Sequence, residues 1–312
     1  MTYSYDPELA ESAARSLGGS WTDATAARQR IAEKFAGLPK HQPSVPLRVQ
    51  DRTIAGPSGN DIPVRLFAPR DRTSDLAALV YFHGGGYVIN GVIDGDNHAS
   101  RVADEVGALV VSVDYRLAPE HPFPAAHDDC YTALEWVAKN TAELGVDPER
   151  IGVGGESAGG GLAAAVALRA RDEHGPAIRF LYLIVPELDD RLQTHSARTY
   201  TDTPNWSRTI GQQSWSYYLG TGVPGSPDVS AYAAPARAHD LTNMPPTHIS
   251  AMQFDPLRDE DIDFAQRLLQ AGVNTELHCY PGTFHGSHLT DAAISRRTLA
   301  DAMAALRRGL VD

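Results

Sequence analysis

The chain has 312 residues, of which 42% are hydrophobic and 21% charged, so it is long and apolar enough to bury the core of a folded domain. Its formal net charge of −12, from 27 basic against 39 acidic residues, argues against nucleic acid as a partner, because neutralising phosphates requires a basic excess. The first residues lack the basic and apolar stretches of a secretory signal, and no run reaches the roughly 18 apolar residues of a membrane span, so we expect no stable membrane insertion.

The N-terminal part of the chain changes its hydrophobic period from that of helices to that of strands. Residues 8–17 and 24–35 carry apolar side chains at spacings of three and four, which predicts two helices. Apolar and polar residues then alternate at 47–49 and at 62–66, with a glycine- and proline-containing turn between them. This pattern predicts two half-buried strands that form an antiparallel edge of a sheet.

The rest of the chain contains short, largely apolar runs that are mostly separated by helix-length segments. The runs are residues 77–82, 108–113, 151–154, 180–185, 247–252 and 275–280. Apolar strands that alternate with helices are typical of a parallel sheet covered on both faces. Together with the two strands at the start, they predict an α/β fold with a mostly parallel eight-stranded sheet flanked by helices.

One long segment, residues 186–235, interrupts this alternation and contains no convincing strand. An excursion of this length between two strands is typical of a lid or an added helical layer. Its aromatic residues are compatible with two roles, lining a substrate pocket or packing the segment onto the core. They are Trp206, Trp215, Tyr217 and Tyr218. Since no repeat or linker divides the chain, we expect a single domain over residues 1–312.

A candidate nucleophile lies between the apolar run 151–154 and an alanine-rich helix. Gly155, Ser157 and Gly159 have the spacing of a nucleophile elbow, in which a serine occupies a tight, strained turn. The helix that follows would place its free amides and positive dipole end near the serine. The alternative is a glycine-rich turn that only packs closely or holds a phosphate. A dinucleotide- or nucleotide-binding loop is disfavoured, because the turn comes midway along the chain and no lysine follows the glycines.

A candidate oxyanion hole follows the apolar run that ends at Phe82. Acyl transfer builds negative charge on an oxygen, and backbone N–H groups aimed at that oxygen lower the barrier. In the His83-Gly84-Gly85-Gly86 stretch, glycines allow the loop to turn its amides inwards. We assign the N–H groups of Gly84, Gly85 and Ala158 to this role. The alternative is an ordinary flexible loop.

The candidate base is His285, which lies in the loop directly after the last predicted strand. Loops beyond the carboxyl ends of strands are where α/β sheets build their sites, and a neighbouring imidazole can accept the proton of a serine hydroxyl. His288 is the competing candidate, because it lies close by in the sequence.

The candidate carboxylate is Asp255, just after the apolar run that ends at Met252. The alternative is that Asp255 caps a helix in which Pro256 is the first residue. Asp259 and Glu260 resemble acids of a first helical turn. The order serine, aspartate, histidine agrees with that of α/β-hydrolases.

With these motifs, the chain resembles the hormone-sensitive-lipase-like family of α/β-hydrolases, the carboxylesterases and lipases with an HGGG motif. The resemblance runs from about Val64 to the C-terminus and rests on the stretches 83–86, 114–126, 155–160 and 255–260. It implies hydrolysis of short- to medium-chain carboxylic esters, with no metal ion and no organic cofactor. It also implies a cap formed by about 1–45 and 187–235, over a catalytic core of about 46–186 and 236–312.

Two residues depart from the usual pattern of this family, and the prolines of the 114–126 stretch have a structural role. Glu156 replaces an aspartate and should leave the elbow intact. Ser287 replaces a phenylalanine, so an aromatic contact is lost and the histidine loop is expected to loosen or change shape. The prolines of the 114–126 stretch would hold that segment extended beneath the oxyanion loop.

We therefore predict a serine carboxylesterase that acts through an acyl-enzyme, with a small-molecule ester as its partner. A lactonase or amidase with the same residues remains an alternative, and so does a small-ligand receptor on this fold. The sequence is compatible with a homodimer but has no feature that requires one. Cys130 and Cys279 are far apart and lack metal-ligand spacing, so we expect two reduced thiols in or near the core and a cytoplasmic location.

Overall fold

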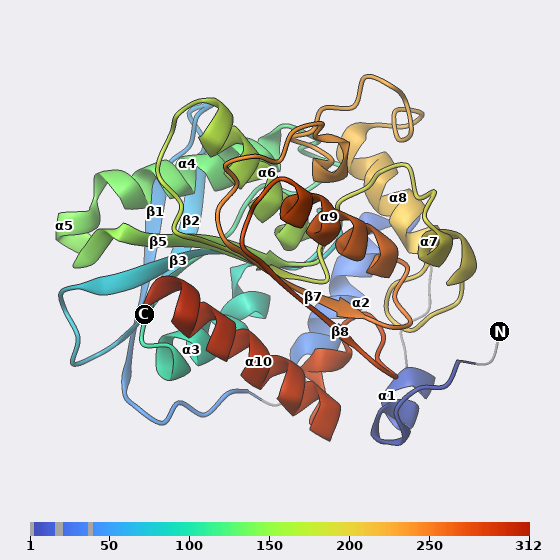
Figure 1. The fold of residues 1–312 in the computed structure, drawn as a ribbon, viewed down its shortest axis with the longest axis horizontal. Helices are drawn as coiled ribbons and strands as arrows, with labels where there is room; N and C mark the ends of the chain where they lie inside the picture. The colour runs from blue at the N-terminus through green and yellow to red at the C-terminus, as the bar shows by residue number, and fades with distance from the viewer. Residues whose placement is uncertain (1–2, 16–20, 37–39) are drawn as a thin grey trace.

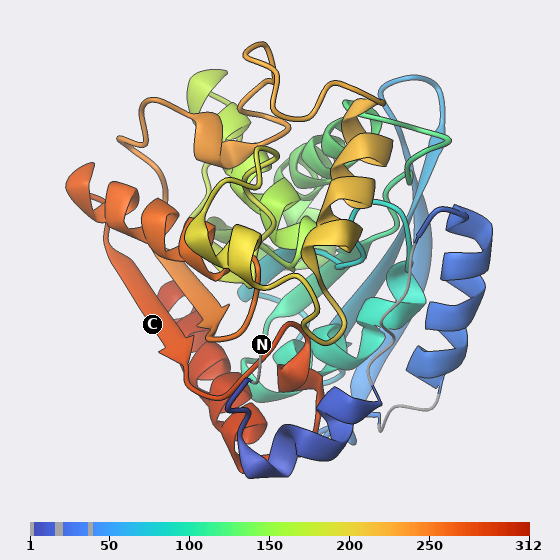
Figure 2. The same ribbon diagram turned by 90° about the vertical axis from the view of Figure 1, so that its right-hand side faces the viewer.

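The computed structural model describes residues 3–15, 21–36 and 40–312, and it shows one sheet between two sets of helices (Figures 1 and 2). The sheet has eight strands in the order β1-β2-β4-β3-β5-β6-β7-β8. β2 pairs antiparallel with both β1 and β4, and the other neighbours are parallel. The strands are β1 (Leu47–Ala55), β2 (Asp61–Pro69), β3 (Leu76–Phe82), β4 (Leu109–Val113), β5 (Val146–Glu156), β6 (Phe180–Ile184), β7 (Thr247–Met252) and β8 (Thr275–Tyr280). The predicted α/β fold is confirmed.

The helices divide between the two faces of the sheet. The α-helices are α1 (Ala10–Ala14), α2 (Ala24–Ala36), α3 (Val92–Glu105), α4 (Ala125–Lys139), α5 (Thr141–Leu144), α6 (Ala158–Asp172), α7 (His195–Thr199), α8 (Arg208–Leu219), α9 (Arg258–Gln270) and α10 (Ala293–Leu310). Short 3₁₀ helices are η1 (Pro7–Leu9), η2 (Pro235–Arg237) and η3 (Ser287–Leu289). α4, α6 and α9 pack on one face, whereas α3 and α10 pack on the other, below the sheet in Figure 1.

The burial of each strand explains its hydrophobic pattern. Every residue of β3 and β4 is buried, because these strands lie inside the sheet and are covered on both faces. β1 is mostly exposed, as an edge strand outside the parallel part of the sheet is free to be. The largest differences from the predicted ranges are at β1, which continues to Ala55 instead of ending at residue 49, and at β5, which begins at Val146 instead of residue 151.

The register of the parallel strands brings loops that are distant in sequence to one edge of the sheet. Phe82 at the end of β3 pairs with Gly155 near the end of β5, so the loops that continue from them start side by side. Met252 and Tyr280, the last residues of β7 and β8, are also paired. The loops that carry the candidate site residues therefore leave the sheet at the same end.

The N-terminal helices pack against parts of the molecule that flank this edge. Leu9 of η1 is buried with Phe284 in the loop after β8, and Ala27 of α2 is buried in a cluster with Trp206. The predicted helices start near the observed α1 and α2, and the end of the first one, at residue 17, lies outside the described residues. Segment 186–235 contains α7 and α8 and no strand, as predicted.

Two further expectations are tested by the described parts of the chain. Within these residues, no helix combines the length and hydrophobicity that a bilayer crossing would require. Both cysteines are free thiols, and Cys130 is buried in the core as expected. Cys279 is instead exposed, on the edge strand β8.

Candidate active site

Ser157 occupies a strained turn between β5 and α6. Its backbone has φ 56° and ψ −122°, a region that non-glycine residues rarely adopt. A Cβ on Gly159 would lie 2.1 Å from the carbonyl oxygen of Phe82, so only glycine allows the helix to start this close to β3. The turn directs the Ser157 side chain away from the sheet at the N-terminus of α6. The local sequence thus has the geometry of a nucleophile elbow.

Three side chains from separate loops meet at this turn. His285 Nε2 lies 3.0 Å from Ser157 Oγ, and His285 Nδ1 lies 2.7 Å from Asp255 Oδ2. The exposed fractions are 4% for Ser157, 7% for His285 and 0% for Asp255, so bulk water does not compete for these bonds. Burial lowers the pKa of His285, but the charge and hydrogen bond of Asp255 more than offset this and raise it above its ordinary value. This arrangement lets Ser157 donate its proton to an imidazole that a buried carboxylate orients.

The alternative interpretation, in which Asp255 caps a helix that begins at Pro256, does not match the structure. α9 begins at Arg258, with Leu257 at the N-cap position, so Pro256 is not its first residue. Asp255 Oδ1 instead accepts a hydrogen bond of 3.0 Å from the N–H of Leu257 in the turn before the helix. This bond leaves Oδ2 directed at His285. Asp259 and Glu260 lie in the first turn of α9, as predicted.

The glycine-rich loop after β3 lies beside Ser157. A Cβ on Gly84 would be 3.3 Å from the Cβ of Ser157. No described residue accepts a hydrogen bond from the N–H of Gly84 or Gly85. Gly85 has φ 126°, and a Cβ there would lie 2.3 Å from the carbonyl oxygen of Ile89, so the loop requires glycine. The three predicted donors, Gly84, Gly85 and Ala158, are thus close together around the serine.

The stretch after β4 supports this loop through side-chain and backbone contacts. The Tyr115 hydroxyl donates a hydrogen bond of 2.7 Å to the carbonyl oxygen of His83, and the two rings stack at 4.3 Å. The N–H of Ala118 donates to the carbonyl oxygen of Tyr87. These bonds match the supporting role expected for residues 114–126, but the predicted extended conformation is wrong in part, because Pro119 and Pro124 lie in turns and α4 begins at Ala125.

The histidine loop is held by hydrogen bonds at Ser287, the position where the family that the sequence resembles usually has a phenylalanine. Ser287 is fully buried, and its Oγ accepts a hydrogen bond from the N–H of Phe284. The carbonyl oxygen of Ser287 accepts hydrogen bonds from Thr290 and Ser295. The loosening expected from this substitution is therefore offset by polar contacts.

His288, the competing candidate for the base, lies away from the serine. Its Nε2 is 3.2 Å from Glu156 Oε1, beneath the elbow. Burial raises the pKa of Glu156, but the neighbouring His288 outweighs burial and lowers the pKa to about 2. Glu156 thus lies beside His288, and the turn at Ser157 keeps the geometry of a nucleophile elbow, as the sequence predicted.

Aromatic side chains border the site. The Trp206 ring lies 5.4 Å from that of His285 and 5.6 Å from that of Trp21. Trp215 and Tyr218 pack on Tyr87, next to the oxyanion loop. Both roles that the sequence left open are therefore present: Trp206 borders the site, and Trp215 and Tyr218 pack the inserted segment onto the core. The Tyr217 hydroxyl instead lies at hydrogen-bonding distance from the carbonyl oxygens of Trp21 and Thr22.

The sequence did not reveal a set of hydrogen bonds that links Ser214, Glu187 and the oxyanion loop. Ser214 Oγ lies 2.9 Å from the carbonyl oxygen of Gly86 and 3.0 Å from Glu187 Oε1. One hydroxyl hydrogen cannot be donated to both acceptors, so both bonds form only when Glu187 is protonated and donates to Ser214. Burial raises the pKa of Glu187 to about 8, consistent with a neutral acid at pH 7. The position of Glu187 shortly after a buried strand could have indicated a functional acid, whereas no sequence feature indicated a role for Ser214.

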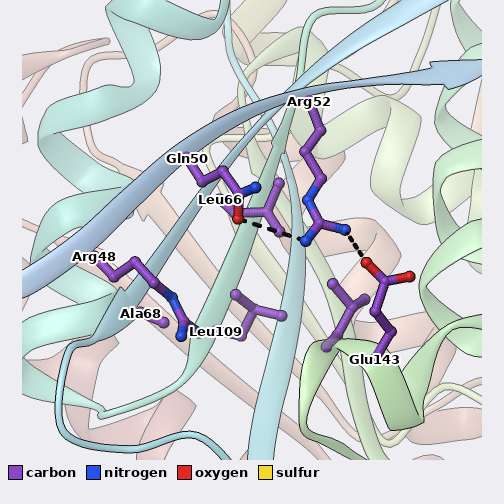
Figure 3. A pocket seen from close by; sticks show the side chains of 8 residues that line it. Arg48, Gln50, Arg52, Leu66, Ala68, Leu109 and Glu143 are labelled. Carbon is purple, nitrogen blue, oxygen red and sulfur yellow. Dashed lines mark hydrogen bonds and ion pairs between the residues drawn. The ribbon is translucent and has the colours of Figure 1, made fainter.

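A hollow elsewhere on the surface is unrelated to this site. Figure 3 shows it over β1 and β2, where Arg52 pairs with Glu143 at 2.6 Å. These strands lie at the opposite edge of the sheet from β7 and β8. None of the predicted site residues lines the hollow, so we do not assign it to the substrate.

Comparison with known proteins supports the same interpretation. A family model described as the alpha/beta hydrolase fold matches residues 79–289. Carboxylesterase NlhH of Mycobacterium tuberculosis is 41% identical over 241 residues, which cover 77% of this chain and 75% of that protein. Esterase LipI of the same organism is 38% identical over 260 residues, covering 83% and 80%. A solved structure of a bacterial heroin esterase is 44% identical, covers 99% of both chains and superposes with a TM-score of 0.95.

Proposed function

We propose, for a chain that belongs to the hormone-sensitive-lipase-like family of α/β-hydrolases, that Ser157, His285 and Asp255 cleave carboxylic esters through an acyl-enzyme. The protein is a carboxylic ester hydrolase, and its relatives are named as carboxylesterases and esterases. The observation that carries the assignment of residues is the pair of hydrogen bonds joining Ser157 Oγ to His285 and His285 to Asp255.

The mechanism follows from the positions of these groups. His285 Nε2 accepts the Ser157 proton as Oγ attacks the ester carbonyl, and the N–H groups of Gly84, Gly85 and Ala158 stabilise the oxyanion. The protonated His285 donates its proton to the departing alcohol, which leaves the acyl group on Oγ. Water then attacks the acyl-enzyme with His285 again as the base, and His285 returns the proton to Oγ as the bond from Oγ to the acyl carbon breaks and the carboxylic acid leaves. Asp255 holds the imidazole with Nδ1 protonated throughout.

The walls of the site support short- to medium-chain esters as substrates. Trp206 and Trp21 lie over the oxyanion loop, since a Cβ on Gly86 would be 3.0 Å from one ring and 2.7 Å from the other. With p-nitrophenyl esters from acetate to palmitate, we expect kcat/KM to be highest at acetate to butyrate and to fall at least about tenfold by decanoate, because longer chains meet these rings. A profile that rises with chain length would contradict this proposal.

Adding lactones and anilides to this substrate series separates the alternative functions. A lactonase or amidase would prefer cyclic esters or anilides to linear esters at matched concentrations. A ligand receptor would turn over none of them. We expect linear esters to react fastest, because the relatives are named for ester hydrolysis.

The pH dependence of hydrolysis provides a test of His285. The base must be neutral to accept the serine proton, so kcat/KM falls as the pH drops through the pKa of His285 in the free enzyme. Because the net effect of its surroundings is to raise that pKa above 6.5, we expect the midpoint of the acid limb above pH 6.5. A pH profile of kcat/KM with butyrate ester measures it. A midpoint below pH 6.5 would contradict the assignment of Asp255 as the partner.

Other features stay predictions. We propose that the cap consists of about 1–45 and 187–235, which is supported by the packing of Trp206 and α2 near His285. The substrate partner is a small-molecule ester. We also propose a cytoplasmic location, and a homodimer stays compatible with the sequence.

A further inference from the structure

Three potential metal ligands lie side by side at the edge of the sheet far from the hollow of Figure 3. His248 on β7 pairs in register with Glu276 on β8, and Ser250 pairs with His278. Because alternate residues of a strand point to the same face, His248, Glu276 and His278 share one face of this strand pair. α10 covers that face, below β7 and β8 in Figure 1.

The ligand atoms of these residues are nearly at the spacing of a metal site. All three lie within 4.8 Å of one another. His278 Nε2 is 2.6 Å from Glu276 Oε1, and His248 Nδ1 is 4.0 Å from the same oxygen. Tetrahedral zinc with bonds of about 2.0–2.1 Å holds its ligands about 3.4 Å apart. The Glu276 side chain is 39% exposed, so it can rotate by the small amount needed.

A buried ring nitrogen of His248 also indicates that an ion binds here. His248 is fully buried, and its Nδ1 has no hydrogen-bond partner among the described residues. A buried polar atom left unpaired is costly and rare in folded proteins.

The second nitrogen of each imidazole already faces a polar group. His248 Nε2 lies 3.0 Å from Ser250 Oγ, and His278 Nδ1 lies 3.7 Å from Asp301 Oδ2. Histidine ligands commonly donate their other ring N–H to such partners, which fixes the tautomer and the ring orientation. Arg308 hydrogen-bonds Glu276 Oε2 and leaves Oε1 for the cluster. The surroundings therefore suit metal binding through Nδ1, Oε1 and Nε2.

We infer that His248, Glu276 and His278 bind one zinc ion, with water as a fourth ligand, and that this ion joins edge strand β8 to β7. Two imidazoles and one carboxylate suit zinc, whereas magnesium and calcium prefer sites built from oxygen ligands alone. His248 lies near the start of β7, and Asp255 follows the other end of that strand. The ion would thus stabilise the sheet edge without entering the ester reaction.

Isothermal titration of the chelator-treated full-length protein with zinc chloride tests this inference. We expect one zinc ion per chain, no comparable binding of magnesium or calcium, and a melting temperature that rises with zinc. His278→Ala and Glu276→Gln should each weaken zinc binding by at least about 100-fold, because each removes a ligand. Ser250→Ala should weaken it by about 10–100-fold, because the ligand set stays but His248 loses its partner.

His239→Ala is the matched control, since this exposed histidine lies outside the cluster. It should bind zinc as the unaltered protein does. Esterase activity checks that each variant is folded, because none of these residues touches Ser157 or His285. The inference is overturned if the protein binds no zinc, or if His278→Ala and Glu276→Gln bind it as tightly as His239→Ala. These results would leave the proposed ester hydrolysis unaffected.

Discussion

Ser157→Ala is expected to lower kcat for p-nitrophenyl butyrate by about 10⁶-fold while the protein stays folded. The substitution removes the atom that would form the acyl-enzyme, and neither His285 nor the oxyanion loop can replace it. Alanine also fits the backbone at φ 56° no worse than serine, so the elbow should be retained. Steady-state kinetics measures the loss, and thermal unfolding followed by circular dichroism checks the fold.

A serine outside the site provides the control for this change. Ser58→Ala alters an exposed turn between β1 and β2 and should leave kcat within a factor of two or so of the unaltered enzyme. A fluorophosphonate probe should label the unaltered enzyme and Ser58→Ala but not Ser157→Ala. Undiminished turnover by Ser157→Ala, or labelling of that variant, would refute the assignment of the nucleophile.

Asp255→Asn is expected to lower kcat by about 10⁴-fold. The asparagine can still accept the hydrogen bond from Leu257 through its amide oxygen, so the turn before α9 should persist. Its amide nitrogen, however, would donate to His285 Nδ1 and place the imidazole proton on Nε2. In that tautomer Nε2 cannot accept the proton of Ser157, although the 3.0 Å distance is unchanged. The loss should therefore fall on kcat rather than KM.

Asp259→Asn makes the same chemical change four residues later. Asp259 pairs with Arg258 in the first turn of α9 and has no contact with His285. We expect its kcat to stay within a few-fold of the unaltered enzyme, because a partly exposed ion pair contributes little. If both variants lose activity equally, general destabilisation of α9 explains the loss. A decrease of less than about tenfold in Asp255→Asn would show that another group orients His285.

These variants probe a site whose electrostatics come from burial. Ser157, His285 and Asp255 are each less than a tenth exposed, and the neutral Glu187 lies fully buried near the same loop. In such surroundings an unpaired charge is costly, whereas a correctly placed donor is worth more than in water. The protonated Glu187 therefore fits a role in holding the Gly86 carbonyl through Ser214 without adding negative charge beside the oxyanion.

The local sequence determined the strands, the elbow and the glycine-rich loop of this protein. Hydrophobic period and glycine spacing act over a few residues, so 151–159 and 82–86 could be interpreted without knowing what lies opposite them. Even the choice of His285 rested on a local feature, its place directly after the last strand.

Only the tertiary structure decided which polar groups meet. Ser214 is contributed by a helix of an inserted segment, yet it bonds Gly86, which is 128 positions earlier in the chain. The juxtaposition of His248 with Glu276 depends on the register of β7 against β8, and a shift of one residue would turn one of them to the other face. The Asp255 carboxylate likewise bonds both Leu257, just before α9, and His285 in the loop after β8. Contacts of this kind follow from packing between distant segments, and no local pattern encodes them.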